Sequence, residues 1–216
     1  MTHRRLVLLL VPLVLFAVLL PGCVPVTESL SDPDKAEPDK RLLGKWQRRV
    51  GDEIRGLEID SPAVKGNPKG LMRAVYNGQE DDPKNAFWFF TTTIGKHTYA
   101  TIYLDPRDNM APLPEFADFR KEGAFEKWNK GKDRCYFIFR YVLDRDKLTV
   151  DGGEMEAMKK LMQAEKIEGM PSRLVPGLGM PYFKTPSGWL ATYLEKSGPQ
   201  TLYNGTNVQE WQRPKK

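Results

Sequence analysis

Residues 134–150 read RCYFIFRYVLDRDKLTV, and this stretch decides the fold class. Two runs of branched and aromatic residues, 134–143 and 147–150, flank the polar triplet Asp144-Arg145-Asp146. Branched and aromatic side chains favour strands, whereas aspartate favours turns because its carboxylate bonds nearby backbone groups. The stretch therefore predicts an antiparallel β-hairpin.

The same pattern repeats along most of the chain. Short runs rich in Val, Ile, Thr and aromatic residues alternate with clusters of Gly, Pro, Asn and Asp, which mark turns. Gly95-Lys96 separates two of these runs and predicts a tight hairpin turn. The other predicted strands are 45–50, 56–59, 70–76, 86–94, 97–104, 200–203 and 208–213.

Few segments have helical periodicity. Apolar residues recur at helical spacing within 154–167, and Asp151 with Glu154 three residues later predicts the start of this helix. Thr185-Pro186 predicts a second helix over 185–195, because proline suits the first helical position. A short helix is also expected within 116–128. The chain is therefore predicted to be mainly β, an antiparallel barrel or strongly curved sheet with one or two packed helices.

The first 22 residues have the composition of an export signal. His3, Arg4 and Arg5 precede the apolar run Leu6–Leu20, and small residues follow it. A membrane-spanning helix needs roughly 20 apolar residues, which is longer than this run. We predict a signal peptide over 1–22, with an uncut N-terminal anchor or cleavage at another position as the alternatives.

Leu20-Pro21-Gly22-Cys23 resembles the lipobox of bacterial lipoproteins. In that family the cysteine thiol receives diacylglycerol, the signal is cut just before the cysteine, and the new amine is usually acylated. The resemblance implies cleavage between Gly22 and Cys23, lipid attachment at Cys23, and export. Two or more acyl chains hold a protein stably at a bilayer, so the membrane is the implied partner, facing the periplasm or the cell surface.

Residues 24–40 read VPVTESLSDPDKAEPDK, which is rich in Pro, Asp, Glu, Ser and Lys. Such a composition buries too little apolar surface to offset the entropy lost on ordering. We therefore predict three parts: a lipoprotein signal peptide over 1–22, a lipidated flexible tether over 23–41, and one folded domain over 42–216.

Leu43-Gly44-Lys45-Trp46 opens the folded part and resembles the Gly-x-Trp signature on the first strand of lipocalins. Such barrels often carry a late arginine packed over the tryptophan, and Arg213 could fill that role. Three later segments, in this order, resemble uncharacterised bacterial lipoproteins with a lipocalin-like fold. The resemblance implies a lipocalin-like β-barrel with Gly44, Trp46 and Arg213 as its signature, and it brings no established activity. The three segments are YFIFRYVLDRDKLTV, EAMKKLMQAEKIEG and YFKTPSGWLATYLEK.

No motif in the chain predicts catalysis, a metal site or a cofactor. Beyond the leader His97 is the one histidine, so a three-histidine zinc site is impossible and a Ser-His-Asp triad would have to use it. Cys135 lies in an apolar run where the thiolate is disfavoured, which argues against a pair with His97. A hydrolase with two carboxylates stays open, because such pairs are set by space rather than by sequence.

Aromatic density is the feature most open to a functional interpretation. Residues 87–90 and 136–139 are almost entirely aromatic, so both faces of each predicted strand carry rings. In a barrel one face points inward and the other outward, against a helix or a partner. An eight-stranded barrel has an interior that is either filled or just large enough for one small ligand.

We therefore expect a non-enzymatic binding module for a small apolar ligand or an envelope protein. The alternative is a structural or envelope-assembly protein with a filled barrel, and a hydrolase is the third possibility. An apolar cavity with a few converging polar groups would favour the first, and a solid interior the second. The net charge of +5, which includes Arg4 and Arg5 of the leader, is too small to predict a nucleic-acid partner.

Overall fold

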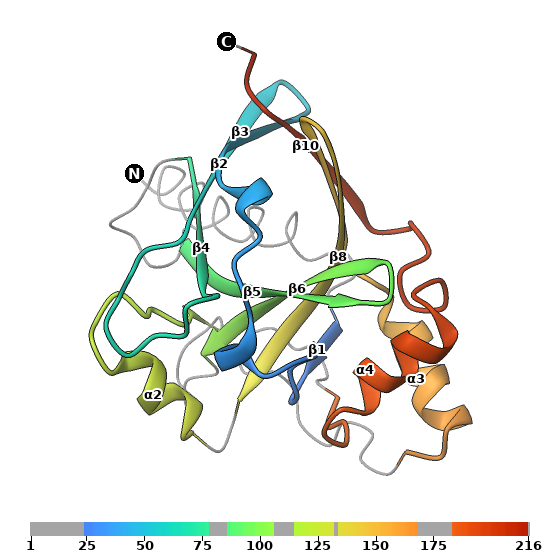
Figure 1. The fold of residues 1–216 in the computed structure, drawn as a ribbon. Helices are drawn as coiled ribbons and strands as arrows, with labels where there is room; N and C mark the ends of the chain where they lie inside the picture. The colour runs from blue at the N-terminus through green and yellow to red at the C-terminus, as the bar shows by residue number, and fades with distance from the viewer. Residues whose placement is uncertain (1–23, 78–85, 106–114, 132–133, 168–182, 216) are drawn as a thin grey trace, which may run out of the picture.

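The computed structural model describes residues 24–77, 86–105, 115–131, 134–167 and 183–215. These residues form a closed antiparallel barrel of eight strands with short helices packed outside it (Figure 1). The mainly β fold predicted from the sequence is therefore confirmed. The leader, its predicted cleavage position and Cys23 lie outside the described residues.

The barrel strands follow one another in the order β2-β3-β4-β5-β6-β8-β9-β10, and β10 returns to β2. Their bounds are β2 (Gly44–Val50), β3 (Glu53–Asp60), β4 (Met72–Tyr76), β5 (Ala86–Ile94), β6 (His97–Asp105), β8 (Cys135–Asp144), β9 (Lys147–Asp151) and β10 (Val208–Gln212). The other elements are β1 (Val24–Val26), β7 (Glu115–Phe116), the 3-10 helices η1 (Pro33–Lys35) and η2 (Lys40–Leu42), and the helices α2 (Ala124–Asn129), α3 (Met155–Ala164) and α4 (Trp189–Ser197).

The pairing of β6 with β8 closes the barrel. Their register runs from Thr98 opposite Tyr141 to Leu104 opposite Cys135. The two hairpins on either side of this seam, β5–β6 and β8–β9, were both predicted from the sequence. Gly95 adopts a positive φ of 58° in the first turn, as a two-residue hairpin turn requires.

Three local predictions were wrong. The helix predicted to start at Thr185-Pro186 starts later, because α4 begins at Trp189 and its N-cap is Gly188. Residues 200–203 are not a strand: Leu202 and Tyr203 both donate their backbone N–H to Pro199 in a turn, and their apolar side chains are buried outside the barrel. Asp151 does not cap α3, whose N-cap is Glu154. The Asp151 carboxylate instead accepts the N–H of Gly153 at 3.1 Å and of Gly205 at 3.0 Å, so it joins two loops.

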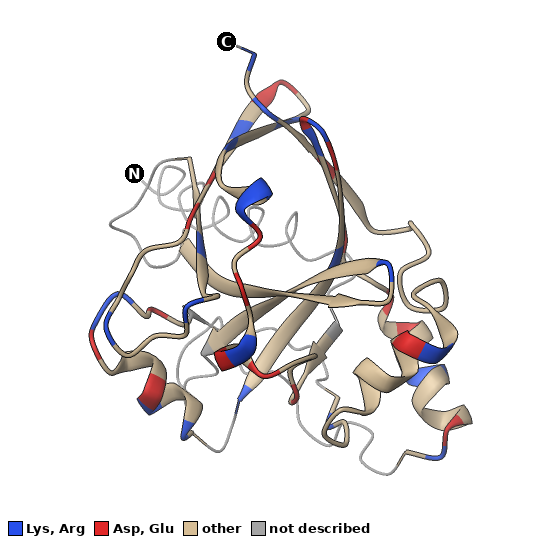
Figure 2. Cartoon of the chain, in the orientation of Figure 1, with Lys and Arg blue, Asp and Glu red and all other residues tan. Residues whose placement is uncertain are grey.

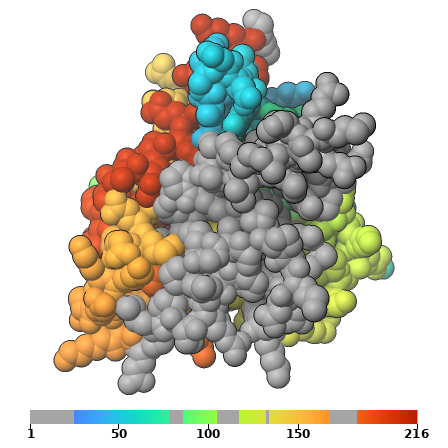
Figure 3. Space-filling model, turned by 180° about the vertical axis from the view of Figure 1, so that it is seen from behind, coloured from blue at the N-terminus to red at the C-terminus, as the bar shows by residue number. Residues whose placement is uncertain are grey.

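Alternation along the strands divides the apolar residues into an inner and an outer core. On β5, Phe89 belongs to the inner core, whereas Trp88 and Phe90 belong to the outer core. This confirms that the aromatic run presents one face inward and one outward. The helices cover the outer face, with α2 and α3 on opposite sides of the molecule in Figures 1 and 3, and Figure 2 shows many of the charged residues on helices and turns.

The segment that follows residue 23 packs onto the barrel, which corrects the flexible tether predicted for 23–41. Strand β1 pairs with β8 from Val24 opposite Ile138 to Val26 opposite Tyr136. Val26 is fully buried, and Leu30 and Ala36 are also buried in the outer core. These apolar residues are spaced among the polar ones, so average composition conceals their contribution.

The reason for this docking is a difference in strand length. Strand β9 pairs with β8 only from Arg140 to Asp144, which leaves the first half of that edge of β8 without a barrel partner. An unpaired strand edge is a template for another strand, and β1 occupies it. Further along, the backbone of Ala36 lies so close to Gly70 that a Cβ there would come within 2.2 Å of the Ala36 oxygen.

Substitution of Val26 tests whether this segment belongs to the fold. Val26→Asp places an unpaired charge where the side chain is fully buried, and we expect it to lower the free energy of unfolding by about 3–5 kcal/mol. Asp34→Asn, at an exposed position on the same segment, should change it by less than about 0.5 kcal/mol. Chemical denaturation measures both. Equal stability of the two variants would show that the segment is a loose tether.

Candidate functional site

The three residues predicted as a barrel signature lie together at one end of the barrel. The Arg213 guanidinium lies over the Trp46 ring, 4.2 Å from its centroid, and donates to the carbonyl oxygens of Leu43 at 3.0 Å and Arg41 at 2.7 Å. The indole N–H of Trp46 donates to Leu42 at 2.7 Å. The cluster therefore ties the end of the chain to the start of the barrel.

Gly44 has two reasons to be glycine at this cluster. Its φ of 107° is strained for residues with a side chain, and a Cβ would lie 3.0 Å from Nη1 of Arg213. A larger residue would therefore push the guanidinium away from Trp46. The three residues therefore occur together for a local reason: glycine at position 44 leaves room for the Arg213 guanidinium to lie over Trp46.

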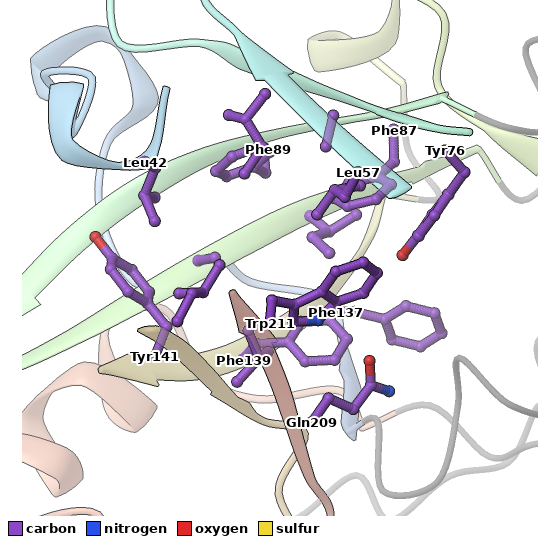
Figure 4. Close-up of a pocket in the computed structure, with 16 residues that line it drawn as sticks. Leu42, Leu57, Tyr76, Phe87, Phe89, Phe137, Phe139, Tyr141, Gln209 and Trp211 are labelled. Carbon is purple, nitrogen blue, oxygen red and sulfur yellow. The ribbon is translucent and has the colours of Figure 1, made fainter. Parts of the chain in front are cut away.

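An apolar cavity of about 100 Å³ lies inside the barrel. Sixteen residues line it (Figure 4). Their side chains are hydrocarbon except for those of Tyr76, Tyr141, Gln209 and Trp211. They come from inward-facing positions of seven barrel strands, all but β2, together with Leu42, which precedes the barrel. The cavity is thus a product of barrel closure.

The two ends of the cavity differ. Leu42 and Tyr141 lie at one end in Figure 4, and both are buried. The Tyr141 hydroxyl donates to the Asp39 carboxylate at 2.9 Å, so the segment around η2 seals this end. At the other end lie Tyr76 and Gln209, whose side chains are partly exposed.

The sealing contact is electrostatically supported. Burial raises the pKa of Asp39, but hydrogen bonds from Arg41 and Tyr141 outweigh burial and lower the pKa below its usual value. Burial raises the pKa of Tyr141, and the neighbouring Asp39 charge raises it further. At neutral pH the pair is therefore a phenol donating to a carboxylate.

The residues weighed for nucleophilic chemistry are far apart. Cys135 pairs with Leu104 at one end of β6, and His97 begins β6, so about 23 Å of strand separates them. Burial raises the pKa of Cys135 to about 12, which keeps it a thiol. Partial burial lowers the pKa of His97, and the positive charges of Arg140 and Lys96 lower it further.

The described ranges contain neither a cluster suited to a metal ion nor a helix suited to span a membrane. Among these residues, no three His, Cys, Asp or Glu side chains gather where they could hold a metal ion. No helix in the same ranges is long and apolar enough to cross a bilayer.

Arg48 and Arg55 were not singled out from the sequence, yet both occupy inward-facing positions near the partly exposed end of the cavity. They are opposite each other in the β2–β3 register. A usable signal was present: each is two residues from an inward apolar residue, Trp46 and Leu57, and strand side chains alternate.

Comparison with known proteins gives no match: no protein-family model, curated protein or solved structure is significantly similar to the chain. The closed eight-stranded barrel is therefore established by its own strand order and register.

Removal of the Arg213 side chain tests the role of the signature cluster. Arg213→Ala withdraws two donors from carbonyl groups and uncovers Trp46, so we expect a loss of about 2 kcal/mol in the free energy of unfolding. Lys45→Ala removes a long, exposed ion pair between β2 and Glu58 of β3 and should cost under about 0.5 kcal/mol. Denaturant titration followed by tryptophan fluorescence compares them. A similar, small loss for both would contradict a structural role for Arg213.

Proposed function

We propose that the protein is a non-enzymatic binding module whose barrel interior takes a small apolar ligand, and that it is an exported lipoprotein of lipocalin-like type. The observation that carries the binding role is the apolar cavity of about 100 Å³, sealed at one end and lined by partly exposed residues at the other. Binding sites of this kind are concave and mostly apolar, with a few polar groups that orient the ligand.

The size of the cavity limits the ligand. Sites for drug-sized molecules have volumes of roughly 300–1,000 Å³, well above this one. An apolar cavity of about 150 Å³ in an engineered protein stays dry and binds benzene. The ligand is therefore a single small ring or a short alkyl chain, or the end of a longer molecule that extends out of the barrel.

The lipoprotein assignment rests on the leader and the lipobox resemblance, and β1 gives it a geometric consequence. With the lipid on Cys23, the next residue, Val24, is already paired with Ile138 of β8. No flexible tether then separates the anchor from the barrel. The barrel is therefore held close to the bilayer, where molecules with short alkyl chains are abundant.

A cavity-filling substitution tests the binding role. Ala100 lines the cavity opposite Phe139, and Ala100→Leu adds three carbons where the ligand would lie. We expect at least about a tenfold loss of affinity for 1-octanol, equivalent to about 1.4 kcal/mol, measured by titration calorimetry.

The matched control is Ala63→Leu, which makes the same change at an exposed loop position. It should bind 1-octanol as the unchanged protein does. No binding of 1-octanol or benzene to the unchanged protein would refute the binding role and favour a filled structural barrel.

Lipid attachment is tested on protein extracted from its native membrane. We expect the intact mass to match a chain that starts at Cys23 and carries acyl groups, and Cys23→Ser to release the protein from the membrane fraction. Cys135→Ser replaces the buried cysteine of β8 and should leave the protein at the membrane. An unmodified Cys23 with residues 1–22 still attached would refute the assignment.

A further inference from the structure

Two arginines lie side by side on the inner face of the barrel, on the neighbouring strands β2 and β3. Arg48 of β2 is directly opposite Arg55 of β3. Arg48 is two residues from Trp46 and Arg55 two residues from Leu57, so both side chains belong to the inward face. Like charges directly opposite in an antiparallel pair destabilise a sheet, so this pairing calls for a compensating anion.

The hydrogen-bonding capacity of the pair is largely unused. Nε and Nη2 of Arg48 and Nε of Arg55 are buried and have no hydrogen-bond partner in the part of the chain that the structure describes. Arg55 is paired through Nη2 with Glu53 at a long 3.4 Å, and the Glu53 side chain is 73% exposed. A buried donor without an acceptor is costly, and charged donors most of all.

The arginines lie beside the partly exposed end of the cavity. The Arg48 guanidinium lies over Trp211, 4.8 Å from the ring centroid, and Trp211 lines the cavity. Tyr76, another lining residue, has its ring centroid 6.3 Å from that of Trp211. Figure 2 shows basic residues on the β2–β3 hairpin, and Figure 4 shows Tyr76 and Gln209 away from the end formed by Leu42 and Tyr141.

The electrostatics agree with this placement. Burial lowers the pKa of Arg48; the nearby Tyr76 raises it, and the positive charge of Arg55 lowers it again. Arginine still stays protonated in a protein, so both guanidinium groups keep their charge. Arg48, Arg55 and Glu53 together carry a net charge of about +1. A ligand with one negative charge would neutralise it.

We propose that Arg48 and Arg55 form an oxyanion subsite at the mouth of the cavity, and that the ligand is an amphipathic carboxylate. Its carboxylate lies between the two guanidinium groups, and its short apolar chain enters the cavity past Tyr76 and Trp211. Guanidinium groups bind carboxylates through paired, charge-assisted hydrogen bonds, which the free Nε and Nη2 atoms can supply. This inference rests on the proposed binding function and names its ligand class.

Matched ligands test it on the full chain. Octanoate, 1-octanol and octyl phosphate share one alkyl chain and differ in their polar group. We expect octanoate to bind at least about tenfold more tightly than 1-octanol and more tightly than octyl phosphate, as measured by titration calorimetry. The advantage of octanoate should shrink as salt is added, because ions screen the partly exposed mouth.

Charge removal identifies the residues. Arg48→Gln and Arg55→Gln should each weaken octanoate binding about tenfold or more and remove most of its advantage over 1-octanol. Arg49→Gln is the matched control, because Arg49 is the next residue of β2, faces outward and is exposed. Thermal unfolding of the three variants is measured as a control, and each should show a cooperative transition as the unchanged protein does.

The outcomes separate the two proposals. Binding of 1-octanol with no advantage for octanoate, or equal effects of Arg48→Gln and Arg49→Gln, overturns the carboxylate subsite and leaves the apolar-ligand function standing. Tighter binding of octyl phosphate than of octanoate overturns the choice of carboxylate. If none of the three ligands binds, the proposed function fails and the subsite fails with it.

Discussion

The pairing of β6 with β8 is the interaction on which the rest of the structure depends. It joins segments that lie far apart in the sequence, from Thr98 opposite Tyr141 to Leu104 opposite Cys135, and it turns a meander of hairpins into a closed barrel. Closure removes the sheet edges along this seam and separates an inside from an outside. The consecutive aromatic residues of β5 and β8 then fill two cores at once, one within the barrel and one beneath the helices.

The same seam explains the asymmetry of the cavity. Because β8 extends beyond the reach of β9, its remaining edge binds β1, and the chain then crosses to η2. There Leu42 and the Tyr141–Asp39 hydrogen bond close one end of the cavity. A segment with the composition of a linker thus packs against the barrel and becomes part of the fold. The opposite end keeps the partly exposed Tyr76 and Gln209.

What the sequence predicted depends on how local each cause is. The hairpins around residues 95–96 and 144–146 were predicted because alternation and turn residues lie within one short stretch. Strand β1 was missed because its cause is the spare edge of β8, more than a hundred residues away. The cavity could not be predicted, since its volume depends on how side chains from seven strands pack. Arg48 and Arg55 could have been placed on the inner face by their spacing from Trp46 and Leu57, but only the strand register brings them opposite each other.

Two departures from stable packing coincide at the partly exposed end of the barrel, and their coincidence favours a binding role over a filled barrel. Two other polar groups of the inner face have partners: the indole N–H of Trp46 donates to Leu42, and the hydroxyl of Tyr141 donates to Asp39. Apolar residues at positions 48 and 55 would avoid both the adjacent like charges and the buried, unpaired nitrogens.

A sequence selected for stability alone would also tend to fill a cavity of about 100 Å³, because empty apolar volume lowers stability. Natural proteins keep such costly features chiefly where function requires them, and here one ligand with an apolar chain and an anionic end would satisfy both.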